Sequence, residues 1–545
     1  MGDRIEYDTF LQMDSHGFFK LDIPEKLNMA RISVDYWAEH GRAGDVAMYY
    51  RDEEITYGEL KDLTDRFGAA FHKLGISKGE RFVIRTPNQP EYEVAFFGGQ
   101  KVGAVPIPTN TMLREYELVH IINNSEAVAV ITTEKYVDAI EKIRPKCATL
   151  RHVIVIGAVA EGQVSYDDLM KEEGSNLPYV ETLKDDPAYF LYTSGTTGDP
   201  KGVVHAHRFI IGAGDPIGRF AMGVQRGDIC SGPTALTWMY ALGHNFLFSR
   251  RWGISTAIYY DERFNKERAL EFIEKYKLTH FVGTPTIYKM LMSIPDAEKK
   301  YDTSSLKQCL SSGEPLLAET AREWKRRFGI DILDSMGQTE AHEFCTTRVD
   351  CNVKVGSMGK PLPGIEVAIV DDDGKRMPPD ELGHLVINKD HPGLYLEYFK
   401  SPDLMEKMTI AGKWHDTKDL AYMDEDGYFW YGSRSDDIMT CHGYRISPSD
   451  VETALQEHEV VFEAGVAGVK DPEMGDKVKA WVVLHEGYEG SPELAKQLQD
   501  FVKQTIAPYK FPREIEFIGE LPKNSAGKIL RRELRRWEQE KLEGK

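Results

Sequence analysis

The chain has 545 residues, a length typical of roughly three to four domain-sized units, and it is long enough to bury a large core. Hydrophobic residues make up 41% and charged residues 28%, a composition that excludes a disordered chain. The 67 basic and 87 acidic residues give a formal charge of −20, which argues against a nucleic-acid partner because its phosphates would be repelled.

From about residue 80 to residue 340, short β-branched or aromatic runs alternate with longer amphipathic stretches. This alternation is typical of βαβ units and predicts an α/β fold, with a large N-terminal body of mostly parallel sheets flanked by helices. The predicted strands are 81–85, 127–131, 153–156, 255–260 and 280–282, and the clearest predicted helices are 266–276 and 318–328.

After Gly432 the chain changes to a compact segment with its own strands, 478–484 and 515–518, and its own helices, 493–506 and 529–540. We therefore expect two domains, 1–432 and 433–545, the second a smaller α+β domain joined by the charged stretch 433–437. Four arginines at 531, 532, 535 and 536 favour a solvated helix face, and contact with the phosphates of a ligand stays open as the alternative.

Six cysteines are scattered without close pairs and predict reduced intracellular thiols. A metal site at His342, Cys345 and Cys351 lacks a Cys-x-x-Cys pair, so no structural metal is expected. Acidic residues near the N-terminus and the lack of an apolar run of about 18 residues predict neither a signal peptide nor stable membrane insertion. We expect a cytoplasmic protein, and a homodimer is left open.

A phosphate-binding loop is predicted at residues 192–202, which read Tyr-Thr-Ser-Gly-Thr-Thr-Gly-Asp-Pro-Lys-Gly and follow the apolar run 187–191. Its glycines let backbone N–H groups converge on an anion, and its hydroxyls and lysine add donors and charge. Pro200 stands where a Walker loop would have its second glycine, which excludes the ordinary P-loop. We expect the loop beyond the carboxyl end of a strand in a parallel sheet. The expected phosphate contacts are Thr193, Ser194, Gly195, Thr196, Thr197, Gly198 and Lys201.

This loop resembles the signature of the adenylate-forming superfamily, which comprises AMP-forming acyl-CoA synthetases, adenylation domains and luciferases. Further segments similar to that superfamily's motifs are 56–60, 337–340, 414–419, 432–437, 443–446 and 522–528. The resemblance implies an ATP-dependent ligase that activates a carboxylic acid as acyl-AMP and transfers it to coenzyme A, using ATP, Mg²⁺ and coenzyme A. Two alternatives stay open: an adenylating enzyme that loads a carrier protein, and a nucleotide-binding scaffold without turnover.

The resemblance also implies roles for individual residues. Lys528 would bridge the attacking carboxylate and the α-phosphate, Glu340 would bind Mg²⁺, and Thr339 would contact the α-phosphate. Asp419 would accept hydrogen bonds from both ribose hydroxyls. The implied nucleotide contacts besides these are Arg434, Arg445, Gly313, Glu314, Pro315, Ser335, Met336, Gly337 and Gln338.

By the same resemblance, Asp436 is the hinge about which a mobile C-terminal domain rotates, and His442 and Gly443 lie beside the pantetheine arm of coenzyme A. The sequence departs from the family pattern at two positions. Met336 stands where the family often has an aromatic residue against adenine, and Lys418 stands where it usually has glycine, which could alter the local turn.

Residues 237–243, Thr-Trp-Met-Tyr-Ala-Leu-Gly, fall where the family builds its acyl pocket. The pattern is similar to benzoate–CoA ligases and medium-chain acyl-CoA synthetases, so the resemblance implies a modest apolar pocket formed by Trp238, Tyr240 and Gly243. Aromatic residues at this spacing are as often plain core. No partner for an amino group is evident, which disfavours amino-acid substrates. The expected acid is aromatic, alicyclic or medium-chain.

Overall fold

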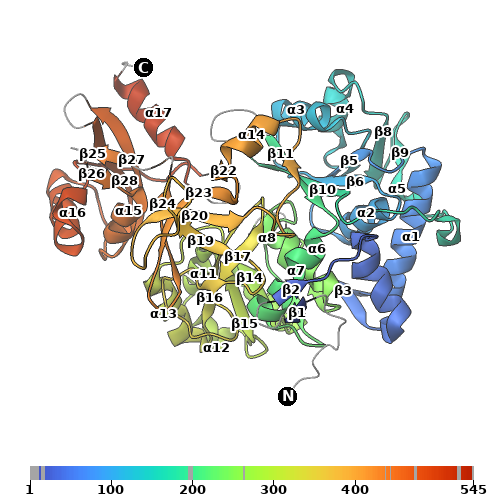
Figure 1. Cartoon of the computed structure of the whole chain (residues 1–545), viewed down its shortest axis with the longest axis horizontal. Coiled ribbons are helices and arrows are strands. Elements are labelled where there is room, and N and C mark those ends of the chain that lie inside the picture. The colour runs from blue at the N-terminus through green and yellow to red at the C-terminus, as the bar shows by residue number, and fades with distance from the viewer. Residues whose placement is uncertain are drawn as a thin grey trace. The chain divides into compact units, whose positions relative to one another are not determined.

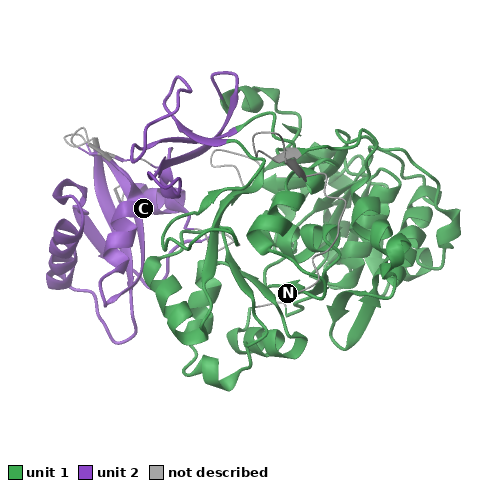
Figure 2. Ribbon diagram, turned by 60° about the horizontal axis from the view of Figure 1, so that its bottom comes forward, with its two compact units in different colours: residues 1–366, 388–409 green, residues 367–387, 410–545 purple. Residues whose placement is uncertain are grey.

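The computed structural model describes residues 11–13, 19–193, 200–261, 264–435, 437, 439–441, 444–471, 475–523 and 529–542. For residues 11–13, 19, 20, 440, 444, 445, 475 and 542 it describes the backbone alone. The chain forms two compact units, coloured separately in Figure 2: residues 1–366 with 388–409, and residues 367–387 with 410–545.

The first unit contains a wholly parallel sheet in the order β6-β5-β7-β8-β9 (Figure 1). Alternate residues of its strands face opposite sides, so Val83 and Val130 pack with helices α3 and α4, whereas Phe82 contacts Phe71 of α1. The strands are β5 (Arg81–Arg85), β6 (Val105–Pro108), β7 (Ala129–Thr133), β8 (His152–Ile156) and β9 (Val164–Ser165). The helices are α1 (Tyr57–Lys73), α2 (Pro90–Lys101), α3 (Glu115–Ser125), α4 (Val137–Ile143) and α5 (Tyr166–Leu169).

The motif at 56–60 has a structural role in this region because it starts α1. The Thr56 side chain accepts a hydrogen bond from the Glu59 backbone N–H, and the Glu59 carboxylate accepts one from the Thr56 N–H (2.8 Å). This reciprocal capping box satisfies backbone donors that the first helical turn would otherwise leave unpaired.

A second sheet in the same unit has the order β18-β17-β16-β15-β14-β12-β13-β3-β4, parallel from β16 to β3 and antiparallel at both edges. Its strands are β3 (Val46–Tyr50), β4 (Glu53–Thr56), β12 (Ile229–Ser231), β13 (Ser255–Ala257), β14 (His280–Gly283), β15 (Gln308–Ser311), β16 (Ile332–Gln338), β17 (His342–Thr346) and β18 (Lys360–Pro361). The helices along this stretch are α6 (Phe209–Gly212), α7 (Gly214–Pro216), α8 (Met239–Leu242), α9 (Ser249–Arg251), α10 (Lys266–Tyr276), α11 (Pro285–Met292), α12 (Ala297–Lys300) and α13 (Ala318–Phe328).

The third sheet of the first unit corrects one expectation about the phosphate loop. β10 (Pro187–Thr193) pairs antiparallel with β11 (Lys201–Ala206), and β11 pairs antiparallel with β21 (Glu397–Tyr398). The loop therefore follows a strand as predicted, but that strand belongs to an antiparallel hairpin and not to a parallel sheet. Thr193 and Lys201 are direct partners in the ladder.

The second unit contains two five-stranded sheets. One has the order β19-β20-β23-β22 with β24 beside β23, and the other has the order β26-β25-β28-β27 with β29 parallel to β28. The strands are β19 (Val367–Val370), β20 (Gly383–Asn388), β22 (Thr409–Ile410), β23 (Trp414–Met423), β24 (Phe429–Arg434), β25 (Met439–Cys441), β26 (Tyr444–Ile446), β27 (Val461–Asp471), β28 (Gly475–Leu484) and β29 (Glu514–Phe517). The remaining helices of the chain are α14 (Pro402–Lys407), α15 (Pro448–Gln456), α16 (Pro492–Thr505) and α17 (Arg531–Leu542).

The predicted domain boundary after Gly432 falls inside the second unit. The sheet that ends with β24 groups with the C-terminal residues, and the Ser447 hydroxyl donates a hydrogen bond to the Gly432 carbonyl (2.8 Å). Rotation of a part starting at residue 433 about a hinge at Asp436 stays a prediction.

The predicted α/β class, with a large body of mainly parallel sheets and a smaller C-terminal part, is confirmed. All six cysteines are free thiols, and Cys351 alone among them is partly exposed. Among the helices within the described ranges, none is long and apolar enough to cross a membrane.

Candidate active site

The Gly337-Gln-Thr-Glu340 motif lies at the end of the β16–β17 hairpin. Gly337 is paired with Glu343, and Thr339 and Glu340 form the turn between the strands. A side chain at Gly337 would collide with the backbone, because a Cβ there would lie 2.5 Å from the His342 carbonyl oxygen. Glycine therefore permits the close strand approach that presents Thr339 and Glu340 at the tip.

Glu340 is held by the segment that contains β21. The Tyr398 hydroxyl donates to the Glu340 carboxylate (2.7 Å), and the Tyr395 N–H donates to the Glu340 carbonyl (2.8 Å). Burial and the Glu340 charge raise the pKa of Tyr398, so the phenol keeps its proton and remains a donor. A partly exposed carboxylate with one oriented oxygen fits the Mg²⁺ role predicted for Glu340.

The neighbouring residue, Thr339, is fixed by the strand that starts at Lys201. His205, near the end of β11, donates from Nε2 to the Thr339 carbonyl (2.8 Å), and its ring stacks on Tyr189. Burial lowers the pKa of His205 to about 3, so the imidazole is neutral at physiological pH. Two motifs far apart in sequence are thus joined through one strand.

Sequence reasoning missed His205, Tyr395 and Tyr398. None of them belongs to a recognised motif, and their roles depend on the pairing of β11 with β21, which has no local sequence signal.

The residues predicted around adenine lie in two adjacent strands and the loop after β15. The Ser312 hydroxyl donates to the Ser335 carbonyl (3.0 Å), and Gly313 has a positive φ of 95° with open space where a Cβ would stand. The Glu314 carboxylate accepts from the Thr286 hydroxyl (2.9 Å) at the start of α11. Its charge therefore stabilises that helix terminus. Met336 is half-buried and lies on β16, the strand that pairs with β15.

In the second unit, Asp419 and Arg434 are direct cross-strand partners. Arg434 Nη1 lies 3.4 Å from Asp419 Oδ1 and donates to the Thr417 carbonyl (3.1 Å). The arginine thus orients the carboxylate predicted to bind ribose. The contact of Arg434 with the nucleotide stays a prediction.

Lys418, the departure from the family's glycine, keeps a glycine-like backbone with φ of 60°. Its ammonium lies 2.7 Å from Asp416 Oδ2, and its N–H donates to Asp416 Oδ1 (2.9 Å). Hydrogen bonds from His384 and Lys418 outweigh burial and lower the pKa of Asp416 to about 2. The lysine therefore preserves the turn, and Asp416 compensates the strain of a left-handed non-glycine residue.

The predicted acyl-pocket residues lie at α8 and at the π-helical turn Gly243–Phe248 that follows it. Trp238 is partly buried immediately before α8, and the Tyr240 ring lies 4.7 Å from that of His244. A Cβ on Gly243 would lie 2.0 Å from His342 Nε2. The imidazole of His342, on β17, therefore occupies the space that a side chain at residue 243 would need.

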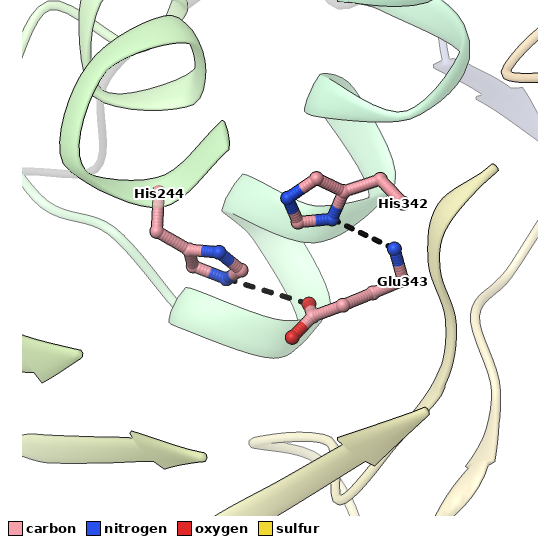
Figure 3. A group of neighbouring side chains, drawn as sticks. All are labelled: His244, His342 and Glu343. Carbon is pink, nitrogen blue, oxygen red and sulfur yellow. Dashed lines mark hydrogen bonds and ion pairs between the residues drawn. The ribbon is translucent and has the colours of Figure 1, made fainter. Parts of the chain in front are cut away.

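His244, His342 and Glu343 form a buried cluster, shown in Figure 3. His244 Nε2 lies 3.4 Å from Glu343 Oε2, and the Glu343 N–H donates to His342 Nδ1 (2.7 Å). Burial lowers the pKa of His342 far below its ordinary value, so its ring is neutral. His342 Nδ1 accepts the hydrogen bond from the Glu343 N–H, so the proton of the neutral ring is on Nε2. Neither nitrogen then has a free lone pair for a metal ion, which disfavours metal binding in this arrangement.

Several predicted site residues lie outside the described residues: Ser194, Gly195, Thr196, Thr197, Gly198, Asp436, His442, Gly443 and Lys528. The backbone of Arg445 pairs with Thr440 between β26 and β25. The structure describes this pairing without the arginine side chain.

Comparisons with known proteins agree with this architecture. The family model of AMP-binding enzymes matches residues 34–399, and the model of the AMP-binding enzyme C-terminal domain matches residues 450–528. Acetyl-coenzyme A synthetase from Bacillus subtilis (strain 168) is 36% identical and is aligned over 94% of this chain and 91% of its own length.

Two solved structures are similar over nearly their whole length. An anthranilate CoA ligase, AuaEII, in complex with anthranoyl-AMP, is 32% identical with a TM-score of 0.87, covering 95% of this chain and 98% of its own. A benzoate CoA ligase from Burkholderia xenovorans LB400 is 30% identical with a TM-score of 0.83, covering 93% and 99%. These relatives do not favour the carrier-protein alternative, and the chain therefore belongs to the AMP-binding enzyme family as an AMP-forming acid–CoA ligase.

Proposed function

We propose that this ligase activates an aromatic, alicyclic or medium-chain carboxylic acid. The carboxylate would attack the α-phosphorus of ATP and release pyrophosphate, and the thiol of coenzyme A would then displace AMP from the acyl adenylate. The relatives act on acetate, anthranilate or benzoate by name, which supports a small acid without selecting one.

One observation carries the assignment of the ATP site. The strand that begins with Lys201 also bears His205, whose ring binds the Thr339 carbonyl beside Glu340. The predicted phosphate loop and the predicted metal-binding turn are therefore attached to the same strand. Two anions must approach each other in this reaction. Donors and charges that are already in place stabilise its transition state, because they need not reorganise during the reaction.

The side chains of this chain would divide the work as follows. Lys201 and the loop hydroxyls would bind the triphosphate, and Thr339 would contact the α-phosphate. Glu340, oriented by Tyr398, would hold Mg²⁺, which when bound supplies positive charge to the phosphate oxygens. Lys528 would lie between the attacking carboxylate and the α-phosphate.

The second unit would complete the nucleotide site and accept coenzyme A. Asp419, oriented by Arg434, would bind the ribose hydroxyls, and Arg445 would approach a phosphate. Asp436 would be the hinge of a mobile part that starts at residue 433, and His442 and Gly443 would border the pantetheine path. We further propose a cytoplasmic location.

The test measures acid-dependent pyrophosphate release and acyl-CoA formation over a panel of small acids. Lys528→Ala should lower adenylation by about 10²-fold or more while sparing thioester formation from a supplied acyl adenylate. Tyr398→Phe should raise the Mg²⁺ concentration needed for half-maximal adenylation, with Tyr395→Phe as the matched control. If no acid in the panel supports release of pyrophosphate and AMP, the proposed function is wrong.

A further inference from the structure

Glu343 is a buried carboxylate that the roles proposed so far do not use. It lies on β17, is 2% exposed, and has Oε1 in hydrogen-bonding contact with the Ser335 hydroxyl. Its Oε2 accepts no hydrogen bond among the described residues, and His244 Nε2 lies 3.4 Å from it. A buried carboxylate oxygen without a donor is costly unless something else fills the position.

The donors around Glu343 are too few for the acceptors. The Ser335 hydroxyl has one proton but faces two acceptors, the Ser311 carbonyl (2.9 Å) and Glu343 Oε1. His244 directs Nδ1 at the Tyr240 carbonyl (3.2 Å), so that nitrogen carries a proton. His342 adds no donor to the carboxylate, because its protonated Nε2 lies against Gly243.

Tyr240 adds an unused hydroxyl to the same cluster. Its ring lies beside His244, and its buried Oη faces the Ser335 hydroxyl but makes no hydrogen bond of standard geometry with the residues that the structure describes. Burial and the charge of Glu343 raise the pKa of this phenol, so it keeps its proton. The cluster thus contains an unfilled acceptor, Glu343 Oε2, and an unfilled donor, the Tyr240 hydroxyl.

The cluster lies beside the proposed reaction site within the first unit. Glu343 is the ladder partner of Gly337 in the nucleotide motif, and it follows Glu340 by three residues. Tyr240 is one of the residues predicted to form the acyl pocket. An acyl group attached to AMP would therefore pass close to these unfilled polar groups.

We propose that the preferred acid carries a hydroxyl or an uncharged amino group that donates a hydrogen bond to Glu343 Oε2, a proposal that rests on the ligase function above. A hydroxyl fits best, because it can donate to Glu343 and also accept from Tyr240. An unsubstituted acid would leave both groups buried and unpaired. The proposal adds one polar group to the modest apolar pocket that the resemblance implies.

The size of the effect follows from the asymmetry of polar recognition. A pocket built to bind a substrate hydroxyl rejects the analogue that lacks it far more strongly than an apolar pocket rejects a missing methylene. We expect the kcat/KM of the favoured hydroxy- or amino-substituted acid to exceed that of its unsubstituted partner by about 10⁴-fold. The position of the substituent on the acid is what the experiment identifies.

The experiment compares matched acids with the full-length enzyme. Benzoate is paired with the three hydroxybenzoates and the three aminobenzoates, cyclohexanecarboxylate with its 4-hydroxy analogue, and hexanoate with 6-hydroxyhexanoate. The kcat/KM for acyl-CoA formation is measured for the parent, Glu343→Gln and Glu343→Leu. Glu343→Gln should reduce the preference at least tenfold, and Glu343→Leu should favour the unsubstituted member.

Asp215→Asn is the matched control, because Asp215 is another buried carboxylate of the first unit, paired with Arg251 at 2.8 Å. It should lower the thermal unfolding temperature and leave the order of acids unchanged. The inference is overturned if the parent prefers every unsubstituted acid, or if both Glu343 variants keep the parent's order of acids. If none of the acids in the panel forms acyl-CoA, the proposed function itself is wrong.

Discussion

Two buried carboxylates of the first unit, Glu93 and Glu343, have very different surroundings. Glu93 receives two hydrogen bonds from Arg250 (2.8 and 3.1 Å), and Arg250 also donates to the Ala47 carbonyl and the Thr256 hydroxyl. Glu343 has only Ser335 and the more distant His244. Both carboxylates are almost fully buried, so burial alone does not separate a structural ion pair from a binding group.

The difference lies in how many hydrogen-bonding positions the protein itself fills. The Glu93–Arg250 pair is bidentate and closed, which is how a buried charge is retained for structure. The cluster at Glu343 is open, with an unfilled acceptor and an unfilled donor beside the predicted acyl site. Removing a side chain of the Glu93–Arg250 pair should lower the free energy of unfolding. Removing the carboxylate of Glu343 should change which acids the enzyme prefers.

The largest effect is expected from breaking the closed pair. Glu93→Gln removes the charge that compensates Arg250 and should lower the free energy of unfolding by about 3 to 5 kcal/mol. Adding Arg250→Met should recover much of the loss, since no uncompensated charge then remains. Chemical denaturation gives the free energy of unfolding of both variants. Equal values for the parent and Glu93→Gln would show that the Glu93–Arg250 pair does not stabilise the fold.

A second closed network, in the C-terminal unit, should show a smaller loss. Arg531 binds Glu452 (2.7 Å) and Asp437 (3.1 Å), and Arg535 also binds Asp437 (2.8 Å). These two arginines are therefore structural, whereas Arg532 and Arg536 pair with Glu533 on the exposed face.

Arg531→Met should destabilise this unit by roughly 2 to 3 kcal/mol, because it leaves Glu452 buried without its main partner. Arg532→Met is the control on the exposed face and should change stability by less than about 0.5 kcal/mol. Limited proteolysis and thermal unfolding would report the two changes. Similar losses for both variants would show that Arg531 is no more structural than its neighbour.

Asp334, next to Ser335 on β16, should make stability depend on pH. Burial raises its pKa from 3.8 to about 8, so the folded protein binds a proton that the unfolded chain releases. The stability that this residue contributes is therefore present at low pH and falls as pH rises from about 4 to about 8.

For one proton the slope is at most about 1.4 kcal/mol per pH unit. Asp334→Asn should flatten the pH dependence of the unfolding free energy over this range and make the protein relatively more stable near pH 8. Denaturant titrations at several pH values test the sign. A variant that loses stability more steeply than the parent as pH rises would contradict it.

The smallest stability change is expected at the open cluster. Glu343→Gln should alter the unfolding free energy by no more than about 1 kcal/mol, because no bidentate partner is lost. Thermal unfolding, measured together with the acid panel, checks this. A loss as large as that of Glu93→Gln would place Glu343 among the structural pairs.

The sequence predicted elements whose signal is local. Helices 266–276 and 318–328 match α10 and α13 residue for residue, because their apolar periodicity and charged faces are complete within one segment. The strand predicted at 255–260 is shorter, since β13 ends at Ala257. Residues 258–260 are apolar or aromatic like the strand, and only the sheet partner decides where pairing stops.

Long-range pairing accounts for what the sequence did not reveal. The antiparallel β10–β11 hairpin, the contact of Tyr398 with Glu340 and the orientation of Asp419 by Arg434 all depend on which strands become neighbours. Motifs located the chemistry at Thr339, Glu340 and Asp419. The motifs did not predict a role for Glu343, because its burial and its few hydrogen-bond partners depend on the tertiary structure.

The direct pairing of Thr193 with Lys201 has a consequence for engineering the nucleotide loop. The ladder pairs Thr193, which precedes the connecting segment, with Lys201, which follows it. The segment's length and composition can therefore be varied as a cassette while the lysine stays anchored to the sheet. A library built between these two residues would separate what the loop's own groups contribute to catalysis from what the side chain of Lys201 contributes.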